Sequence, residues 1–549
     1  MQELGGDADM EELARQDKTA QEKYLQAAKK LSAARKQAAE KLSQEITLAT
    51  QQFTHTLNLT QKLTDKLDLN ATVGYEYMTY TNKGSYMSGY GQGGVAGGFG
   101  NYGLDFTNYI QYSNSSNRSI GSFEDPSYSL QSYFGRAVFN YDQKYFLTAI
   151  VRADGSSKFG TNNKYGYFPA LSAAWMVSKE KFFKVDFINS MKIRAGWGKT
   201  GNQEFPSGAA QRRYSFSGDG SGGLNAVNNA NADLKWQADR QYGVGADIVI
   251  LKNKVNITVD YFNKKTTDLL FPTEAIQPGA PGGAVTWKNL AGSIVNKGME
   301  VAVNSTIISK KDFSWDFGVN ATFINNMVEG LPGSINTGAL DGQGISGSTV
   351  EVIRSGLPIN AFVTRDFLGF DKTNGLAIYQ KDGDVLYYKG SPNAKTVLGI
   401  STTVNYKKFT VTANMNGSFG NMIYNNTLNN VINVGSINNG KNIAVSVYEN
   451  PIKESFANPV TASSRFLEKG DYLKMTNATL SYAIGNIGKV FKGANIYVTG
   501  QNLFVITKYS GFDPEVNVDK NVNGVPSVGI EYIPYPSART VTFGLNVSL

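Results

Sequence analysis

The residue types that carry most enzymatic and metal chemistry are scarce in this chain. Among 549 residues there is no Cys and only one His, so a Cys/His zinc site and an internal disulfide framework are both excluded. The single imidazole, His55, lies in a stretch that alternates polar and apolar residues, and any Ser-His-Asp arrangement would depend on that ring alone. The sequence therefore gives no catalytic, cofactor-binding or metal-binding residue.

Three further patterns carry weaker chemical signals. Asp371, Asn374, Asp382 and Asp384 offer oxygen ligands, but their spacing does not match an EF-hand loop and indicates a solvated turn. The Gly-rich segment Gly91–Gly103 lacks the Lys-Ser/Thr of a phosphate-binding loop. No pair of carboxylates stands out as a glycosidase acid and nucleophile, so a glycoside hydrolase stays an open alternative without assigned residues.

Recognition by loops is the chemistry that the composition favours. The segment Met78–Tyr112 mixes many aromatic rings with Gly and Asn. Flat rings stack on sugar faces and amide side chains bond to hydroxyl groups, although the same residues also suit loops that pack on one another or on a lid protein. We take Tyr86 and Tyr90 as candidate substrate-binding residues.

Such loops need a rigid support, and the sequence predicts that strands provide it. From Val541 to Leu549, apolar side chains at odd positions alternate with Thr, Gly, Asn and Ser. Val255, Ile257, Val259 and Tyr261 alternate with polar neighbours in the same way. The pattern recurs in stretches of about ten residues, the length that a tilted strand needs to cross a bilayer. The predicted fold is an all-β, transmembrane antiparallel β-barrel, with about fifteen strands in this chain.

The predicted connections alternate between short and long. This asymmetry is typical of transmembrane barrels, which have tight turns in the periplasm and long loops outside. The short or medium connections fall at 64–66, 142–144, 178–190, 252–254, 309–312, 407–408 and 485–493. The long ones fall at 78–130, 154–165, 200–237, 264–295, 327–397, 420–470 and 506–537.

The remaining composition narrows the alternatives. No stretch approaches the roughly 18 apolar residues of a spanning helix. The net charge of +8 is not gathered in a basic block, which argues against nucleic-acid binding. Residues 9–45 are rich in Ala, Lys, Gln and Glu and predict an amphipathic helix. We divide the chain into a helical segment of unclear role, residues 1–50, and a barrel portion, residues 51–549.

The number of strands and the alternation of their connections also predict the direction of the first strand. If the last strand descends to the periplasm, the alternating connections make the first strand, Phe53–Thr60, descend as well. A complete barrel begins in the periplasm, so we expect an amino-terminal portion with further strands to precede this chain. The first residues, Met1–Asp7, show neither the basic region nor the apolar core of a signal peptide.

Seven segments together resemble the carboxy-terminal barrel half of the SusC/RagA family, the TonB-dependent outer-membrane transporters of Bacteroidetes. Each segment is weak alone, but their order is specific, and the resemblance covers roughly residues 53–549. The segments are Arg152–Gly160, Tyr165–Ala170, Lys192–Gln203, Asn296–Glu300, Gly369–Gly375, Tyr497–Phe504 and Tyr509–Glu515. The Gly, Asp and Ser of residues 154–160 suit a tight loop at the end of a strand, so we expect loop scaffolding there more than substrate contact.

The resemblance implies import of oligosaccharides or oligopeptides across the cell outer membrane, without a cofactor or enzymatic step. It implies a twenty-two-stranded barrel around a plug, a SusD-like lipoprotein as a lid, and energy from TonB–ExbB–ExbD through the plug, which has no visible counterpart here. Thr542, Gly544, Val547 and Leu549 resemble the terminal signal that the barrel assembly machinery reads, with Leu in place of the usual aromatic residue. A soluble or surface-attached β-rich glycan-binding protein or adhesin is the alternative.

Overall fold

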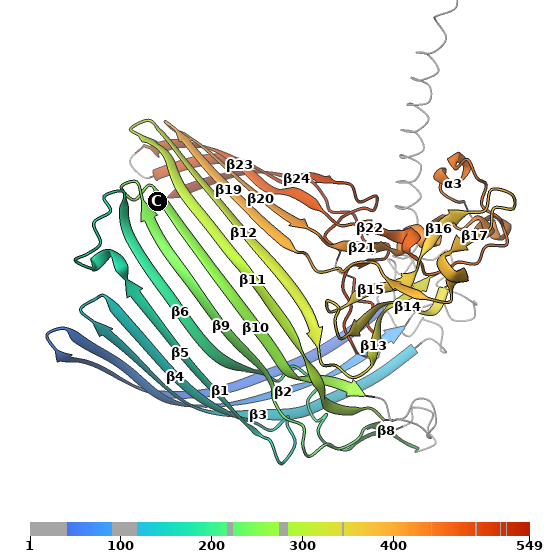
Figure 1. Ribbon diagram of the computed structural model, residues 1–549, viewed down its shortest axis with the longest axis horizontal. Helices are drawn as coiled ribbons and strands as arrows, with labels where there is room; N and C mark the ends of the chain where they lie inside the picture. The colour runs from blue at the N-terminus through green and yellow to red at the C-terminus, as the bar shows by residue number, and fades with distance from the viewer. Residues whose placement is uncertain are drawn as a thin grey trace, which may run out of the picture. The chain divides into compact units, whose positions relative to one another are not determined.

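The main body of the protein is one large antiparallel sheet (Figure 1). The structure is a computed structural model that describes residues 41–89, 118–216, 223–273, 284–342, 345–440, 442–488, 491–516, 518–522 and 524–548. The sheet has 15 strands and confirms the predicted number. In sheet order they are β1 Lys41–Thr64, β2 Leu67–Gly89, β3 Arg118–Tyr141, β4 Tyr145–Ser156, β5 Tyr165–Met176, β6 Ile188–Asn202, β9 Gln237–Ile250, β10 Val255–Thr273, β11 Thr286–Lys310, β12 Phe313–Glu329, β19 Thr396–Tyr406, β20 Phe409–Phe419, β23 Tyr472–Ile487, β24 Phe491–Thr507 and β26 Thr540–Ser548.

The chain divides into two compact units, Met1–Phe53 with Met78–Ser129, and Thr54–Tyr77 with Leu130–Leu549. The second unit holds the strands from β4 onward and all of the folded long connections described below. No helix among the described residues is long and apolar enough to cross a membrane.

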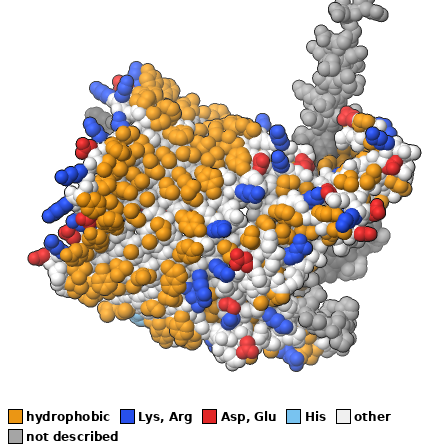
Figure 2. All heavy atoms as spheres, viewed as in Figure 1, with side chains coloured by type: hydrophobic (Ala, Val, Ile, Leu, Met, Phe, Trp, Pro, Cys, Tyr) orange, Lys and Arg blue, Asp and Glu red, His pale blue; other side chains and the backbone are white. Residues whose placement is uncertain are grey.

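Strand pairing brings the apolar positions onto one face. Tyr261 of β10 pairs with Val244 of β9 and with Met299 of β11, and these three side chains are 44%, 54% and 42% exposed. Val255, Ile257 and Val259 lie on the same face of β10, as predicted. Figure 2 shows hydrophobic side chains gathered in a broad band over these strands. Further exposed members of this apolar face are Leu171, Trp197, Phe323, Val411, Leu480, Ile496 and Leu545.

The short connections lie at one end of the strands and the long ones at the other, as predicted. Tyr141 pairs with Tyr145 beside the turn between β3 and β4, and Tyr406 pairs with Phe409 beside the turn between β19 and β20. The last strand ends at the same end, because Ser548 pairs with Gly493 near the start of β24.

Several predicted boundaries were wrong. The loop predicted at 264–295 is shorter, because β10 continues to Thr273 and β11 begins at Thr286. Lys41–Glu45, expected to end a helix, belong to β1, so strand replaces helix over residues 41–50 of the segment 1–50; residues 1–40 lie outside the described residues. The loop predicted from Met78 to Leu130 is shorter, because β2 continues to Gly89 and β3 begins at Arg118. Glycines make room for this extension: an added Cβ at Gly121 would lie 2.5 Å from the Tyr86 ring, so the ring covers that glycine.

The long connections fold into structures of their own rather than open loops. Between β12 and β19 lie a four-stranded sheet and a two-stranded sheet; between β20 and β23, and after β24, lie short helices and a three-stranded sheet. These elements are β7 Arg213–Phe216, β8 Leu224–Asn228, β13 Ser334–Gly342, β14 Ile345–Arg354, β15 Ala361–Arg365, β16 Phe367–Phe370, β17 Ala377–Tyr379, β18 Leu386–Tyr388, β21 Met422–Asn425, α2 Asn426–Val431, α3 Ser446–Glu449, β22 Leu467–Lys469 and β25 Ile530–Glu531, with 3-10 turns at Val177–Lys179, Gln380–Gly383, Val434–Asn439 and Ser464–Phe466.

Candidate functional site

The second face of the large sheet carries a cluster of paired charges on β6, β9 and β10. Arg194 of β6 donates to both carboxylate oxygens of Asp247 on β9, at 2.8 and 2.9 Å, and to Asp260 of β10 at 3.0 Å. An arginine that binds two carboxylates across three strands holds its guanidinium plane in one orientation. The sequence showed Arg194 and Asp260 separately, but only the strand order brings them together.

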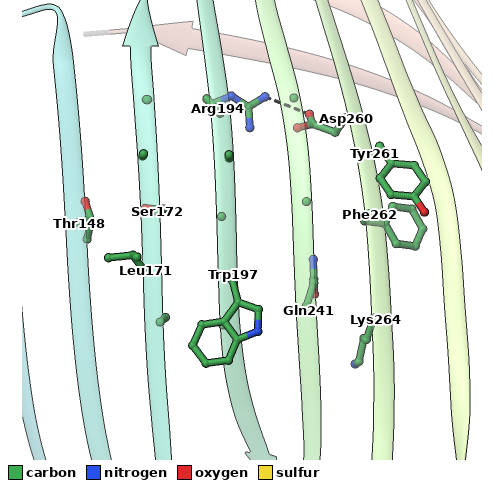
Figure 3. A pocket seen from close by; sticks show the side chains of 18 of the residues that line it. Thr148, Leu171, Ser172, Arg194, Trp197, Gln241, Asp260, Tyr261, Phe262 and Lys264 are labelled. Atoms are coloured by element: carbon green, nitrogen blue, oxygen red, sulfur yellow. Dashed lines mark hydrogen bonds and ion pairs between the residues drawn. The ribbon is translucent and has the colours of Figure 1, made fainter.

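Arg194 and Asp260 of this cluster help to line a hollow of about 1240 Å³. Figure 3 shows side chains that line it, among them the polar Thr148, Ser172, Gln241 and Lys264, the Arg194–Asp260 contact, and the aromatic Phe262. Donors, acceptors and both signs of charge are therefore presented on one surface, while the opposite face of the same strands is apolar. Such a surface suits a hydrated passage with polar contents.

The motif Asp154–Gly160 is held by contacts within the protein, and its first three residues belong to β4 rather than to the expected loop. Phe159 is 3% exposed and packs with Phe205 and Leu234 in a core beneath the loops. Lys158 donates to the Gln203 carbonyl at 2.9 Å, and burial lowers the pKa of Lys158. Gly160 donates its backbone N–H to the Leu234 carbonyl at 3.0 Å. The conformation of the motif is accounted for by these internal contacts.

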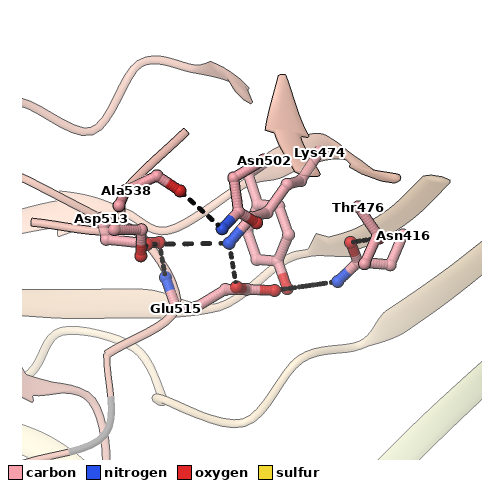
Figure 4. A network of polar contacts seen from close by, with 9 residues as sticks. Asn416, Lys474, Thr476, Asn502, Asp513, Glu515 and Ala538 are labelled. Atoms are coloured by element: carbon pink, nitrogen blue, oxygen red, sulfur yellow. Dashed lines mark hydrogen bonds and ion pairs between the residues drawn. The ribbon is translucent and has the colours of Figure 1, made fainter. Parts of the chain in front are cut away.

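A buried lysine anchors the last long connection to the sheet. Lys474 of β23, 5% exposed, donates to Glu515 at 2.5 Å and lies 3.7 Å from Asp513. Figure 4 shows this network, in which Asn416 of β20 also donates to Glu515, at 2.9 Å. The resemblance named the segment Tyr509–Glu515 but not its partner Lys474, since a single lysine in an alternating strand carries no local signal.

A second core holds the connections 330–395, 420–470 and 508–538 together. Phe362, Tyr424 and Ile530 come from three different connections and are each 0% exposed. Beside them Glu351 of β14 is 2% exposed and accepts from Asn360 at 2.8 Å. Burial raises the pKa of Glu351 to about 8, although hydrogen bonds from Asn360 and Val528 act in the opposite direction.

The structure describes one of the two substrate-binding candidates, Tyr86. Tyr86 lies near the end of β2 and is partly exposed, with its ring over Gly121 of β3; Tyr90 lies outside the described residues. The structure thus places Tyr86 on a strand rather than in a loop.

Three of the four terminal signal residues, Thr542, Gly544 and Val547, lie in β26. Gly544 pairs with Tyr497 of β24, and an added Cβ would lie 2.1 Å from that ring, so only glycine fits. Thr542 pairs with Thr499 and Val547 with Ala494. Leu549 lies outside the described residues.

The acidic turn binds its own backbone. Asp371 accepts from the backbone N–H groups of Thr373 at 2.7 Å and Asn374 at 3.2 Å, and these bonds lower the pKa of Asp371. This is the turn expected from the spacing. Within the described ranges, no group of three or more His, Asp and Glu residues is placed to hold a metal ion.

Comparison with known proteins agrees with this architecture. Residues 24–503 match the family described as TonB dependent receptor-like, beta-barrel. The TonB-dependent receptor SusC of Bacteroides thetaiotaomicron is 30% identical over 76% of this chain and 44% of its own length. The TonB-dependent receptor P3 of Formosa agariphila is 28% identical over 87% of this chain and 50% of its own length. The chain thus spans about half the length of these relatives.

A solved structure shows the same fold. The structure of the RagAB peptide transporter superposes with a TM-score of 0.75 at 21% identity, over 92% of this chain and 56% of that chain. Receptors of this kind are outer-membrane proteins and not enzymes. The family match over most of the chain, together with the two-faced sheet of 15 strands, shows that this chain belongs to the TonB-dependent receptor β-barrel family, within its SusC/RagA branch.

Proposed function

We propose that this chain forms part of the barrel of an outer-membrane transporter that imports oligosaccharides or oligopeptides. The observation that carries the proposal is the segregation of faces: apolar side chains share one face from β3 to β26, while ion pairs such as Arg194–Asp260 line the other. A soluble glycan-binding protein or adhesin has no need of so large an exposed apolar face. The family match and the names of SusC and the RagAB peptide transporter support import.

We further propose the partners of such a transporter. TonB, with ExbB and ExbD, would supply energy through a plug encoded with the barrel, and a SusD-like lipoprotein would cover the folded long connections. The barrel assembly machinery would read the end of the chain, where the sequence of Thr542, Gly544, Val547 and Leu549 fits its signal. The relatives named TonB-dependent receptors support the first of these partners.

Localisation and uptake test the function together. Outer membranes of a strain that expresses the full-length transporter should release the protein only into detergent. Deletion of its gene should abolish uptake of either a labelled maltooligosaccharide mixture or a labelled casein peptide mixture, and deletion of tonB should have the same effect. Release of the protein into aqueous buffer, or unchanged uptake of both mixtures, would reject the proposal.

The cargo surface has its own test. Tyr86 is partly exposed, and Tyr90 follows it closely; if each ring stacks on cargo it contributes on the order of 1 kcal/mol. Tyr86→Ala with Tyr90→Ala in the full-length transporter should weaken cargo binding about tenfold or more without changing its abundance in the outer membrane. The matched control is Tyr80→Ala, since the Tyr80 ring already packs against Tyr128 at 5.2 Å. Loss of lipoprotein association with binding intact would instead assign both rings to the partner interface.

A further inference from the structure

Four neighbouring connections at the short-connection end of the sheet form a basic margin. They join β9 to β10, β11 to β12, β19 to β20, and β23 to β24. Asp312 is the one acidic residue among their described positions 251–254, 310–312, 407–408, 488 and 491–492. Figure 2 shows basic side chains along the margin of the hydrophobic band. We define the basic rim as the exposed lysines Lys252, Lys254, Lys310, Lys311, Lys407, Lys408 and Lys492.

Backbone hydrogen bonds join these connections sideways. The Lys254 carbonyl accepts from the Thr306 N–H at 2.9 Å, Lys407 donates its N–H to the Asp312 carbonyl at 2.8 Å, and the Lys408 carbonyl accepts from the Ala483 N–H at 2.8 Å. Each turn is therefore fixed to the next strand pair. The lysine side chains are therefore carried by one continuous hydrogen-bonded edge of backbone rather than by independent loops.

The lysines of the rim do not form the ion pairs that other lysines form at this end. Lys144, in the connection from β3 to β4, lies 3.4 Å from Asp142 and 3.6 Å from Glu180. None of the seven rim lysines forms an ion pair with any residue that the structure describes. Like charges held in a line repel one another unless anions from outside neutralise them.

The rim stands beside a group of exposed aromatic side chains on the apolar face. The Lys407 ammonium lies 5.5 Å from the Tyr406 ring centroid, and the Lys408 ammonium 5.9 Å from that of Tyr482. Tyr406 and Phe409 are 51% and 46% exposed. Aromatic rings at the end of an apolar face mark the depth of the lipid headgroups, and lysines next to them reach the same layer.

We propose that the basic rim binds the headgroups of anionic phospholipids in the periplasmic leaflet of the outer membrane. The inference rests on the proposed function, which places the short connections in the periplasm. The occupant is an anionic lipid because the charges lie along the edge of a lipid-facing surface, whereas a protein partner would need a surface facing away from the bilayer. A lysine close to an anionic surface contributes roughly fivefold to the affinity.

Lipid selectivity of the full-length transporter tests this proposal. The protein is reconstituted in phosphatidylcholine bilayers with a trace of spin-labelled phosphatidylglycerol or spin-labelled phosphatidylcholine, and the motionally restricted fraction of each label is measured. Phosphatidylglycerol should associate about threefold more strongly or better. The variant Lys254→Gln/Lys311→Gln/Lys407→Gln should reduce this ratio towards one, and about 0.5 M salt should reduce it as well.

Two variants serve as controls for charge and for position. Lys254→Arg/Lys311→Arg/Lys407→Arg keeps the charge and should keep the preference. Lys179→Gln/Lys181→Gln/Lys184→Gln removes the same charge from the connection between β5 and β6, where Glu180 and Asp186 lie alongside, and should keep most of it.

Four results would contradict the proposal. A ratio of one in the unaltered protein, equal losses in the two glutamine variants, or capture of an acidic periplasmic protein without lipid preference would overturn the lipid assignment. If neither label showed a restricted component, the apolar face would not contact lipid. The proposed function would then fail together with the rim.

Discussion

At the scale of single residues, a charged side chain should be costly on the apolar face of β10 and tolerated on its polar face. Val259 lies between Ala246 and Val301 on the apolar face, near the middle of the row from Val255 to Tyr261. Val259→Arg should cost roughly 2 to 4 kcal/mol of folding free energy, because the charge enters the hydrocarbon region. The measurement is a urea titration of the full-length protein folded into lipid vesicles.

The matched control for Val259 lies three residues away. Asn256 pairs with Asn304 on the polar face, where an arginine can meet water, so Asn256→Arg should cost about 1 kcal/mol or less. Equal costs at the two positions would contradict the lipid-facing assignment.

Glu351 makes the stability of the folded connections depend on pH. Burial raises its pKa to about 8 from an ordinary 4.5, so between these values the closed structure holds a proton that the opened, hydrated structure has lost. Stability is therefore fully present below about pH 4.5, decreases as the pH rises, and levels off above about pH 8. Hydrogen exchange over residues 334–354, corrected for intrinsic rates, should show opening becoming easier across this interval.

Glu351→Gln separates the carboxyl group from its surroundings. The amide keeps an acceptor for Asn360, which donates to Glu351 at 2.8 Å, but it does not titrate. Its exchange should be independent of pH across the same interval. A protection that increases with pH in the unaltered protein would show that Glu351 is ionised when buried.

At the scale of elements, the presence of glycine at position 544 of β26 has two explanations, packing under a ring and recognition by the assembly machinery. Gly544 lies under the Tyr497 ring, so its small size serves packing whether or not the assembly machinery reads it. Gly544→Val should lower the abundance of the protein in the outer membrane, because the branched side chain displaces the ring. Adding Tyr497→Ala should restore part of that abundance. Quantitative immunoblots of outer-membrane fractions provide the measurement.

Gly493 of β24 is the control, because it has room for a side chain. An added Cβ at Gly493 of β24 meets nothing closer than 4.0 Å, so Gly493→Ala should be tolerated. If Tyr497→Ala restores nothing to the Gly544 variant, the glycine matters for recognition rather than packing.

Local pattern determined which elements could be predicted. Many strands of the large sheet alternate polar and apolar residues, and their number, their apolar face and the short turns were predictable because a period of two is visible in a single segment. The ends of β2 and β3 were missed because Gly, Ser and Tyr are typical of loops. There the two strands meet in ring-over-glycine contacts such as Tyr86 on Gly121, which join residues far apart in sequence and are not visible in a single segment.

The folded connections were beyond prediction for the same reason. Phe362, Tyr424 and Ile530 meet only after three separate connections converge, and strands such as Leu386–Tyr388 are too short to show a period. Asp371 was predictable, because its turn is closed by hydrogen bonds to residues two and three positions away. Lys474 was not, because its carboxylate partners lie about forty residues further on.

At the scale of the whole molecule, the sheet order leaves two edges. β1 and β26 stand at its ends, and neither has a second strand partner among the described residues. An unpaired edge in the hydrocarbon core would expose backbone N–H and C=O groups that water cannot satisfy, which is why membrane barrels are closed. The relatives extend to about twice the length of this chain, enough to supply further strands.

These edges predict how the 549-residue chain behaves alone. Refolded into detergent, it should form polydisperse assemblies through β1 and β26, and it should migrate identically on denaturing gels with and without boiling, because a closed barrel is what resists unfolding by detergent. The full-length transporter, refolded in parallel, should give one species by size-exclusion chromatography and a mobility shift on boiling. A monodisperse, heat-modifiable species from the isolated chain would mean that its own 15 strands close, and that β1 pairs with β26.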